Sequence, residues 1–220
     1  IVGDSLVEMG TNLKAIPMGG KAVLQLSTGG GFSCFIREDR TLGCFGKNES
    51  GLLGYPFCQD FDGNVGTCGD TRFPFSLPGY GNRAIHSLVA ISLGAGFSPI
   101  AIASGNSDSC VLLSNEGDSP SVKCWGKNDF GQLGQGDKQD RGDELNELGD
   151  ILPPVLLGSG LVAKKVTSGH SHHCAVLVRD GSKLIKCWGK NAYGQLGTND
   201  LLHRGDDANE MGENLPFVYQ

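Results

Sequence analysis

The sequence predicts an all-β chain of tandem propeller-type blades, each built from short antiparallel strands, with about three blades and a partial fourth that do not close within one chain. The first observation is a repeated phrase, which reads CWGKNAYGQLG at residues 187–197, CWGKNDFGQLG at residues 124–134 and, more loosely, CFGKNESGLLG at residues 44–54. Repetition over tens of residues is typical of architectures in which similar units stack on one another. The second observation is glycine, at 35 of 220 residues without a collagen-like period, which indicates many tight turns between short strands.

Each unit is expected to contain a β-hairpin closed by two cysteines. In the third unit, residues 180–181 read Asp-Gly, a strong two-residue turn signal flanked by strand-forming residues. Counting outward from this turn places Cys174 opposite Cys187, at a separation that a disulfide accepts. The same construction fits two more hairpins, and a fourth pair closes an insertion after the first phrase: Cys34 with Cys44, Cys110 with Cys124, and Cys58 with Cys68.

The 8 cysteines also indicate a compartment. Zinc sites use cysteine pairs with about two to four residues between them, and no such pair occurs here. Reduced, buried cysteines are the remaining alternative. Disulfides form and persist in oxidising environments, so the sequence predicts an extracellular or cell-surface protein.

A second phrase separates the units and begins Gly-Asp at residues 3, 142 and 205, with a degenerate version at residue 69. Before each stapled hairpin the chain has an apolar strand followed by a glycine, at Gly29, Gly105 and Gly169. These landmarks divide the chain into four parts, which are unit 1 with its disulfide-closed insertion at residues 1–68, unit 2 with an additional strand at 69–141, unit 3 at 142–204, and the start of a further unit or an assembly tail at 205–220.

The first phrase resembles the repeat named after the regulator of chromosome condensation, in which W-G-x-N-x-x-G-Q-L-G closes each blade. The match is specific at residues 125–134 and 188–197, and it is weaker at 45–54, where Phe45 replaces Trp and Leu52 replaces Gln. The resemblance implies a propeller of four-stranded blades, typically seven, and it covers roles as different as exchange factors for a small nuclear GTPase, light sensors, enzyme inhibitors and interaction scaffolds. The signature positions are Phe45, Gly46, Asn48, Trp125, Gly126, Asn128, Trp188, Gly189 and Asn191.

The number of units departs from that family. A propeller ring needs about four to eight blades, so three units cannot close a ring alone. Open ends would expose strand edges and apolar blade faces to water. The chain is therefore expected either to be part of a longer array or to join other copies of itself, and a head-to-tail contact that does not close generates a filament.

Composition and motifs exclude several functions. The net charge of −6 and the absence of any Lys/Arg run argue against nucleic-acid binding, and no window reaches the ~18 apolar residues of a membrane span. The sequence contains no catalytic or cofactor-binding motif. No metal site is expected either, because His170 and His172 supply only two ligands on one strand. Asn48 begins an N-glycosylation sequon, but the equivalent Asn128 and Asn191 do not, so the alternative is that all three organise a turn.

The leading hypothesis is a non-enzymatic extracellular structural or interaction protein whose blades self-associate into a larger assembly such as a filament. Its partners would be other copies of itself or another protein, with a glycan at Asn48 as an open question and with no nucleic acid. The main alternative is a protein-binding module, such as an inhibitor or a receptor ectodomain fragment that uses loops on one rim. A guanine-nucleotide exchange factor is disfavoured by the stapled hairpins, since the nucleus is reducing.

Overall fold

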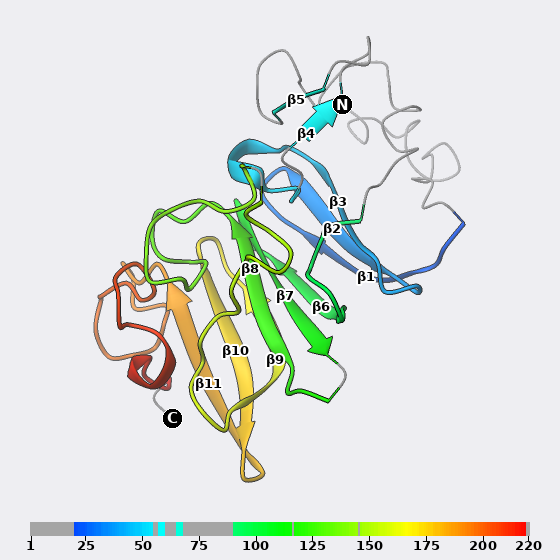
Figure 1. The fold of residues 1–220 in the computed structure, drawn as a ribbon. Helices are drawn as coiled ribbons and strands as arrows, with labels where there is room; N and C mark the ends of the chain where they lie inside the picture. Colours follow the sequence, from blue (N-terminus) through cyan, green and yellow to red (C-terminus); the bar gives the residue numbers. More distant parts are fainter. Residues whose placement is uncertain are drawn as a thin grey trace, which may run out of the picture.

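The described part of the chain contains three antiparallel three-stranded sheets, one from each unit, and one two-stranded sheet (Figure 1). The computed structural model describes residues 20–54, 57–59, 65–67, 90–115, 117–144 and 146–218. The blades are β1 (Val23–Thr28), β2 (Phe32–Arg37) and β3 (Leu42–Gly46); β6 (Phe97–Ser104), β7 (Asp108–Asn115) and β8 (Ser121–Gly126); and β9 (Val162–Ser168), β10 (His172–Arg179) and β11 (Ser182–Gly189). The remaining elements are the pair β4 (Phe57–Gln59) and β5 (Val65–Thr67) and the short 3-10 turns η3 (Glu49–Gly51) and η4 (Gly212–Asn214).

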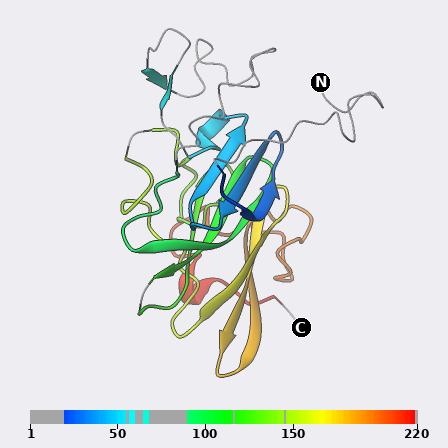
Figure 2. The ribbon, with the colours of Figure 1, turned by 90° about the vertical axis from the view of Figure 1, so that its right-hand side faces the viewer.

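The blades pack side by side in chain order. Strand β6 contacts β1 and β2 of the first blade, and β9 contacts β6, β7 and β8 of the second. The blue first blade and the orange third blade therefore lie at opposite ends of the row, with the green second blade between them (Figures 1 and 2). The predicted fold class, all-β tandem blades that do not close into a ring, is confirmed.

The hairpins form in the predicted register because their turns fix it. Asp180 and Gly181 both have positive φ, 51° and 77°, as a two-residue hairpin turn requires, and this aligns Cys174 with Cys187. Three disulfides staple the three blades, with Cα–Cα distances of 4.0, 4.1 and 4.0 Å: Cys34–Cys44, Cys110–Cys124 and Cys174–Cys187. The fourth expected pair, Cys58 with Cys68, lies partly outside the described residues.

The outer edge of each blade carries one backbone bond where a fourth strand would lie. The three donors belong to the segments that follow each signature phrase. The bonds run from Ile91 N–H to Leu42 O, from Val155 N–H to Val122 O and from Val218 N–H to Ile185 O, at 2.9, 2.7 and 2.9 Å. Of the stretch at residues 89–100 that was expected to give unit 2 an additional strand, residues 90–96 run along the first blade and residues 97–100 belong to β6; residues 212–218 pack on the edge of the third blade.

The core lies between blades rather than within them. One cluster of buried side chains joins the first and second blades around Trp125, and another joins the second and third around Trp188. Each indole is at most 1% exposed. Because burial of apolar surface stabilises by about 25 cal/mol per Å², stacking of neighbouring blades contributes most of the stabilisation, and a blade with one uncovered side lacks part of it.

Candidate functional site: blade junctions and the open face of the third blade

The signature loop of each unit is built around its asparagine. Asn128 Oδ1 accepts the Leu133 N–H at 3.0 Å, and its amide donates to Asp137 O at 2.9 Å, so one side chain ties both ends of the loop. Asn191 does the same in the third unit, and Asn48 Oδ1 accepts the Leu53 N–H at 2.8 Å. Asn48 is only 6% exposed. The structure thus gives the asparagines a turn-organising role, and a glycan on Asn48 would have to displace these contacts.

The signature tryptophans join each blade to the one before it. Trp125 Nε1 donates to Leu52 O at 3.1 Å, and Trp188 Nε1 donates to Gln132 O at 2.9 Å. Both acceptors are the second residue of the G-x-L-G part of the preceding phrase. Phe45 stands at the same position in the first blade, but its ring has no N–H and is half-buried. Tryptophan therefore acts as a clamp between blades, and the first blade lacks one.

Two signature glycines allow a close approach of backbone to backbone. Gly126 and Gly189 have φ of 103° and 101°, and a Cβ on either would lie within 2.9 Å of the backbone at the start of the preceding strand. Each also exchanges backbone bonds with the loop that returns from its own phrase, through Arg141 and Arg204. Gly46 is the equivalent in the first blade, with φ of 116°.

The Gly-Asp phrases cover the signature loop of the preceding blade. A Cβ on Gly131 would lie 2.2 Å from Asp206 N, and a Cβ on Gly51 would lie 2.2 Å from the carbonyl carbon of Gly142. In the Gly-Asp phrase that begins at residue 205, Glu210 Oε2 accepts the N–H groups of residues 205, 206 and 207 and so fixes the conformation of the phrase. The Gly-Asp phrase, which separates units in the sequence, therefore packs over the signature loop of a neighbouring blade.

A ladder of backbone hydrogen bonds runs across the turns at the start of each hairpin. Gly30 N–H donates to Asn106 O, and Asn106 N–H donates to His170 O, both at 2.9 Å. These three residues follow the equivalent glycines of the three units. Within the part of the chain that the structure describes, the His170 N–H and the Gly30 carbonyl have no backbone partner, so the ladder has one unused donor and one unused acceptor.

A buried ionisable pair, which the sequence did not reveal, links the second and third blades. His173 Nε2 lies 2.7 Å from Asp108 Oδ1, and both side chains are fully buried. His173 Nδ1 also lies 2.7 Å from Ser168 Oγ, and the imidazole is tilted against the Trp188 ring at 5.9 Å. The contact with Asp108 is close but not aligned as a hydrogen bond, and among the described residues neither carboxylate oxygen has a hydrogen-bond partner.

This Ser–His–Asp order has the composition of a catalytic triad, but it is sealed between blades. His173 and Asp108 have no exposed surface through which a substrate could reach them, and a general base must come within hydrogen-bond reach of its proton. The equivalent Ser109 and Ser104 hydroxyls bond at 3.1 Å in the second blade. The arrangement therefore lies packed between two blades and does not face a substrate, and its only sequence signal is an Asp where the other units have Phe32 and His172.

The third blade presents its signature loop to solvent. The ring of Phe130 in the second loop is covered by Lys190 Nζ, 4.6 Å from its centroid, and by His203 at 5.3 Å. Its equivalent Tyr193 is 87% exposed, beside Leu201 at 63% and Leu202 at 65%. An open pocket of about 690 Å³ lies on this face and is lined by Gly194, Gly197, Asn199, Asp200 and Leu201.

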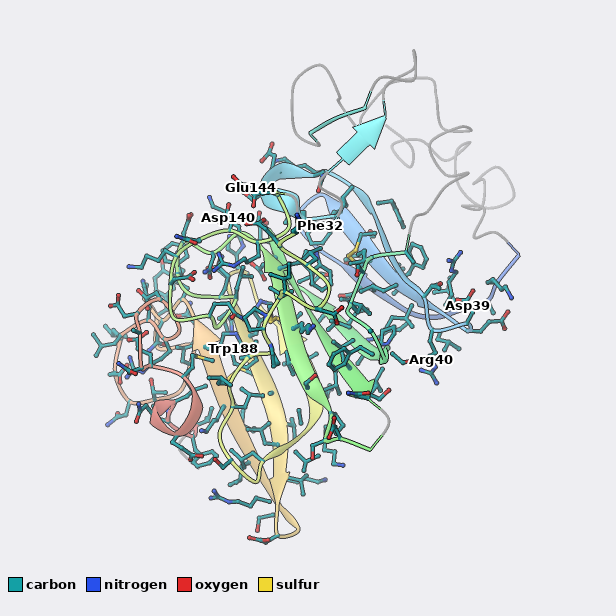
Figure 3. All side chains as sticks on the ribbon, viewed as in Figure 1. Phe32, Asp39, Arg40, Asp140, Glu144 and Trp188 are labelled. Atoms are coloured by element: carbon teal, nitrogen blue, oxygen red, sulfur yellow. A yellow bond between two sulfur atoms is a disulfide. The ribbon has the colours of Figure 1, made fainter. Side chains whose placement is uncertain are left out.

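Figure 3 shows labelled side chains at both ends of the blades. Phe32, Asp140 and Glu144 lie at the end that carries the signature loops, and Asp39 and Arg40 lie at the opposite end, in the β2–β3 turn.

Among the described residues, no three His, Cys, Asp or Glu side chains gather as a metal site would require. The same residues include no helix with the length and apolar character needed to cross a bilayer.

Stacked three-stranded blades, indole clamps and a backbone ladder define an open-ended β-propeller repeat protein. Residues 121–176, and residues 100–132 with 163–195, match the profile described as the regulator of chromosome condensation (RCC1) repeat. Residues 100–195 thus carry RCC1 repeats, and together with the stacked blades these matches support an RCC1-like β-propeller repeat family.

Comparison with known proteins agrees with this assignment. The chain is 27% identical to the ultraviolet-B receptor UVR8 of Arabidopsis thaliana over 180 residues. The aligned region covers 82% of this chain and 32% of UVR8. Among solved structures, human WBSCR16 matches with a TM-score of 0.56 and 18% identity over 85% of this chain and 40% of that one. Prp20p of Saccharomyces cerevisiae matches with a TM-score of 0.50 and 17% identity over 81% and 33%. The chain thus spans about a third of the length of UVR8.

Proposed function

We propose that the protein is a non-enzymatic interaction protein of the extracellular space, and that its copies associate through blade-to-blade contacts into a larger assembly, a ring or a filament. One observation carries this proposal. The same loop phrase is buried beneath the next blade in the first two units and is uncovered in the third, where Gly194, Gln195 and Gly197 are partly exposed and their equivalents in the second unit are buried.

The physical basis is the unused stabilisation at both ends of the row. Tyr193, Leu201 and Leu202 expose apolar surface at one end, and the half-buried Phe45 marks the other. Apolar surface grouped on one face of a protein marks interaction sites. Because the two ends are different surfaces of one molecule, their contact is head to tail, and repetition of such a contact yields either a closed ring or a filament.

Three disulfides support the extracellular setting, since structural disulfides occur mainly in oxidising compartments. The rival function is a module that grips an unrelated protein with its rim loops. Prp20p binds Gsp1p and histones, which is a property of that protein. A nuclear role of that kind for this chain is disfavoured by the stapled hairpins, because reduced thiols are the rule in the nucleus.

The test is the molar mass of the full chain in solution, measured by sedimentation velocity and multi-angle light scattering from nanomolar to high micromolar concentration. We expect the mass to rise with concentration, and Tyr193→Asp to abolish the rise by placing a charge in the contact. Ile151→Asp is the matched control, because Ile151 is 66% exposed in the junction beside the second blade. A chain that stays monomeric at every concentration contradicts self-association and favours the rim-loop module.

A further inference from the structure

We propose that the open face of the third blade receives the first blade of a second copy, in the register that joins blades within the chain, and that Phe45 keeps this junction weaker than the internal ones. The inference rests on the proposed self-association and names the residues that carry it. Every contact it uses has an observed counterpart between two blades of the same chain, so the unoccupied ends can be compared with occupied ones.

The backbone ladder is the first complementary feature. In both internal junctions, the N–H group after the unit glycine donates to the equivalent carbonyl of the following blade. His170 N–H is the donor without a backbone partner at one end, and the Gly30 carbonyl is the matching acceptor at the other, among the residues the structure describes. A second copy placed in the same register brings its Gly30 carbonyl to His170 N–H and adds one rung to the ladder.

The second complementary feature is the side chain that packs under the glycine at the start of each hairpin, which is Gly105 in the second unit and Gly169 in the third. Asp108 and His172 both fold under the preceding glycine, since a Cβ on Gly105 or Gly169 would lie 2.3 or 2.1 Å from them. From that position Asp108 reaches His173 of the next blade, and His173 lies opposite Trp188 in its hairpin.

In the first blade, Ser33 lies opposite Phe45 and so occupies the position of His173. The His172 ring of one copy would therefore meet the Ser33 hydroxyl of the next. Burial, and then the neighbouring His173, lower the pKa of His172, which favours the neutral imidazole. A neutral imidazole and a hydroxyl can hydrogen-bond in either direction.

A lysine over an aromatic ring is the third. Lys190 Nζ sits 4.6 Å from the centre of the Phe130 ring in the preceding blade. Lys47 has the same place in the first blade, directly after the signature glycine, and its side chain is 49% exposed. Tyr193, which has the place of Phe130, exposes its ring at the other end. The register that aligns the ladder thus puts a cation over this ring.

The clamp is the feature that does not match. In the internal junctions an indole N–H reaches the carbonyl of Leu52 or Gln132. The corresponding carbonyl of Gln195 would face Phe45, which has no donor. A missing hydrogen bond to a buried carbonyl weakens association by about tenfold. The residue opposite Phe45 in the hairpin is not an obstacle to tryptophan, because Ser33 faces Phe45 as Ser109 faces Trp125.

The experiment measures the self-association constant of four variants of the full chain by sedimentation equilibrium. Phe45→Trp is expected to tighten association about tenfold by supplying the donor, and Phe45→Leu, which supplies none, is its control. Lys47→Gln is expected to weaken association severalfold, and Lys183→Gln, in the exposed end of the β10–β11 hairpin, is its control. Circular dichroism confirms that each variant is folded, and the Lys47 arm decides if Phe45→Trp is not.

The outcomes separate the two proposals. Tightening by Phe45→Trp together with weakening by Lys47→Gln supports the inference. If the unchanged chain associates, while Phe45→Trp fails to tighten and Lys47→Gln matches its control, the copies join by another surface; the inference is then wrong and self-association stands. If neither the unchanged chain nor Phe45→Trp associates at any concentration, the proposed function is wrong and the inference falls with it.

Discussion

Replacement of Trp188 by phenylalanine tests whether the indole clamp holds neighbouring blades together. Trp188 is fully buried, and its Nε1 donates to Gln132 O at 2.9 Å. Loss of the donor leaves a buried carbonyl unsatisfied, which costs about 1–3 kcal/mol. The smaller ring adds about 1 kcal/mol for the space it leaves in the core. We expect Trp188→Phe to lower the free energy of unfolding by about 2–4 kcal/mol, a large part of the stability of an ordinary domain.

The assay is urea unfolding followed by far-ultraviolet circular dichroism without reducing agent, so that the staples stay closed. Trp125→Phe is a parallel test, because its Nε1 makes the equivalent bond to Leu52 O at 3.1 Å. Tyr193→Phe is the control, since its 87% exposed ring makes a loss above about 0.5 kcal/mol unexpected. A Trp188→Phe chain as stable as the unchanged one would refute the view that the indole joins the blades.

Two further predictions concern the third blade. Lys186 is 1% exposed and donates to Gly212 O at 2.7 Å, and burial lowers its pKa below the ordinary value of 10.5. The unfolded chain therefore binds more protons between the lowered pKa and 10.5, so stability rises with pH in that window. Lys186→Met should flatten this rise, as measured by urea midpoints along a pH series, and an unchanged slope would argue against the burial. The double change Cys174→Ala with Cys187→Ala opens a bridge between residues 13 apart and should cost about 3 kcal/mol of unfolding free energy. Detection of free thiols in the native, unreduced protein by mass spectrometry would contradict the staple itself.

The hairpins were predictable because their information is local. A two-residue Asp-Gly turn fixes which positions face each other, and the Cys174–Cys187 and His173–Trp188 pairs follow by counting. The three units and their signature loops were predictable for the same reason, since each phrase folds on itself around one asparagine, as Asn128 does. The sequence also predicted that three blades leave two open ends.

The contacts between blades were not predictable, because they join residues far apart in the chain through tertiary packing. Asp108 and His173 meet only when the second and third sheets stack, and neither residue stands out in its own strand. The stretch at residues 89–100 is apolar and was expected to form a strand, but only residues 97–100 lie in one, β6. Ile91 is buried, at 5% exposed, but against a neighbouring edge rather than within a sheet of its own. Hydrophobic pattern shows that such a segment is covered and does not show by what.

The ladder at Gly30, Asn106 and His170 consists of main-chain groups alone, and this bears on how proteins of this kind change over generations. A rung made of peptide N–H and C=O takes asparagine or histidine at the second and third positions, whereas a Cβ on Gly30 would lie 2.0 Å from Asn106 Oδ1, so the first position favours glycine. An added unit therefore extends the ladder through its main chain, provided that its residue at this position leaves room for the neighbouring side chain. Chain length can vary in steps of one blade, while selection on the clamps decides which neighbours stay together.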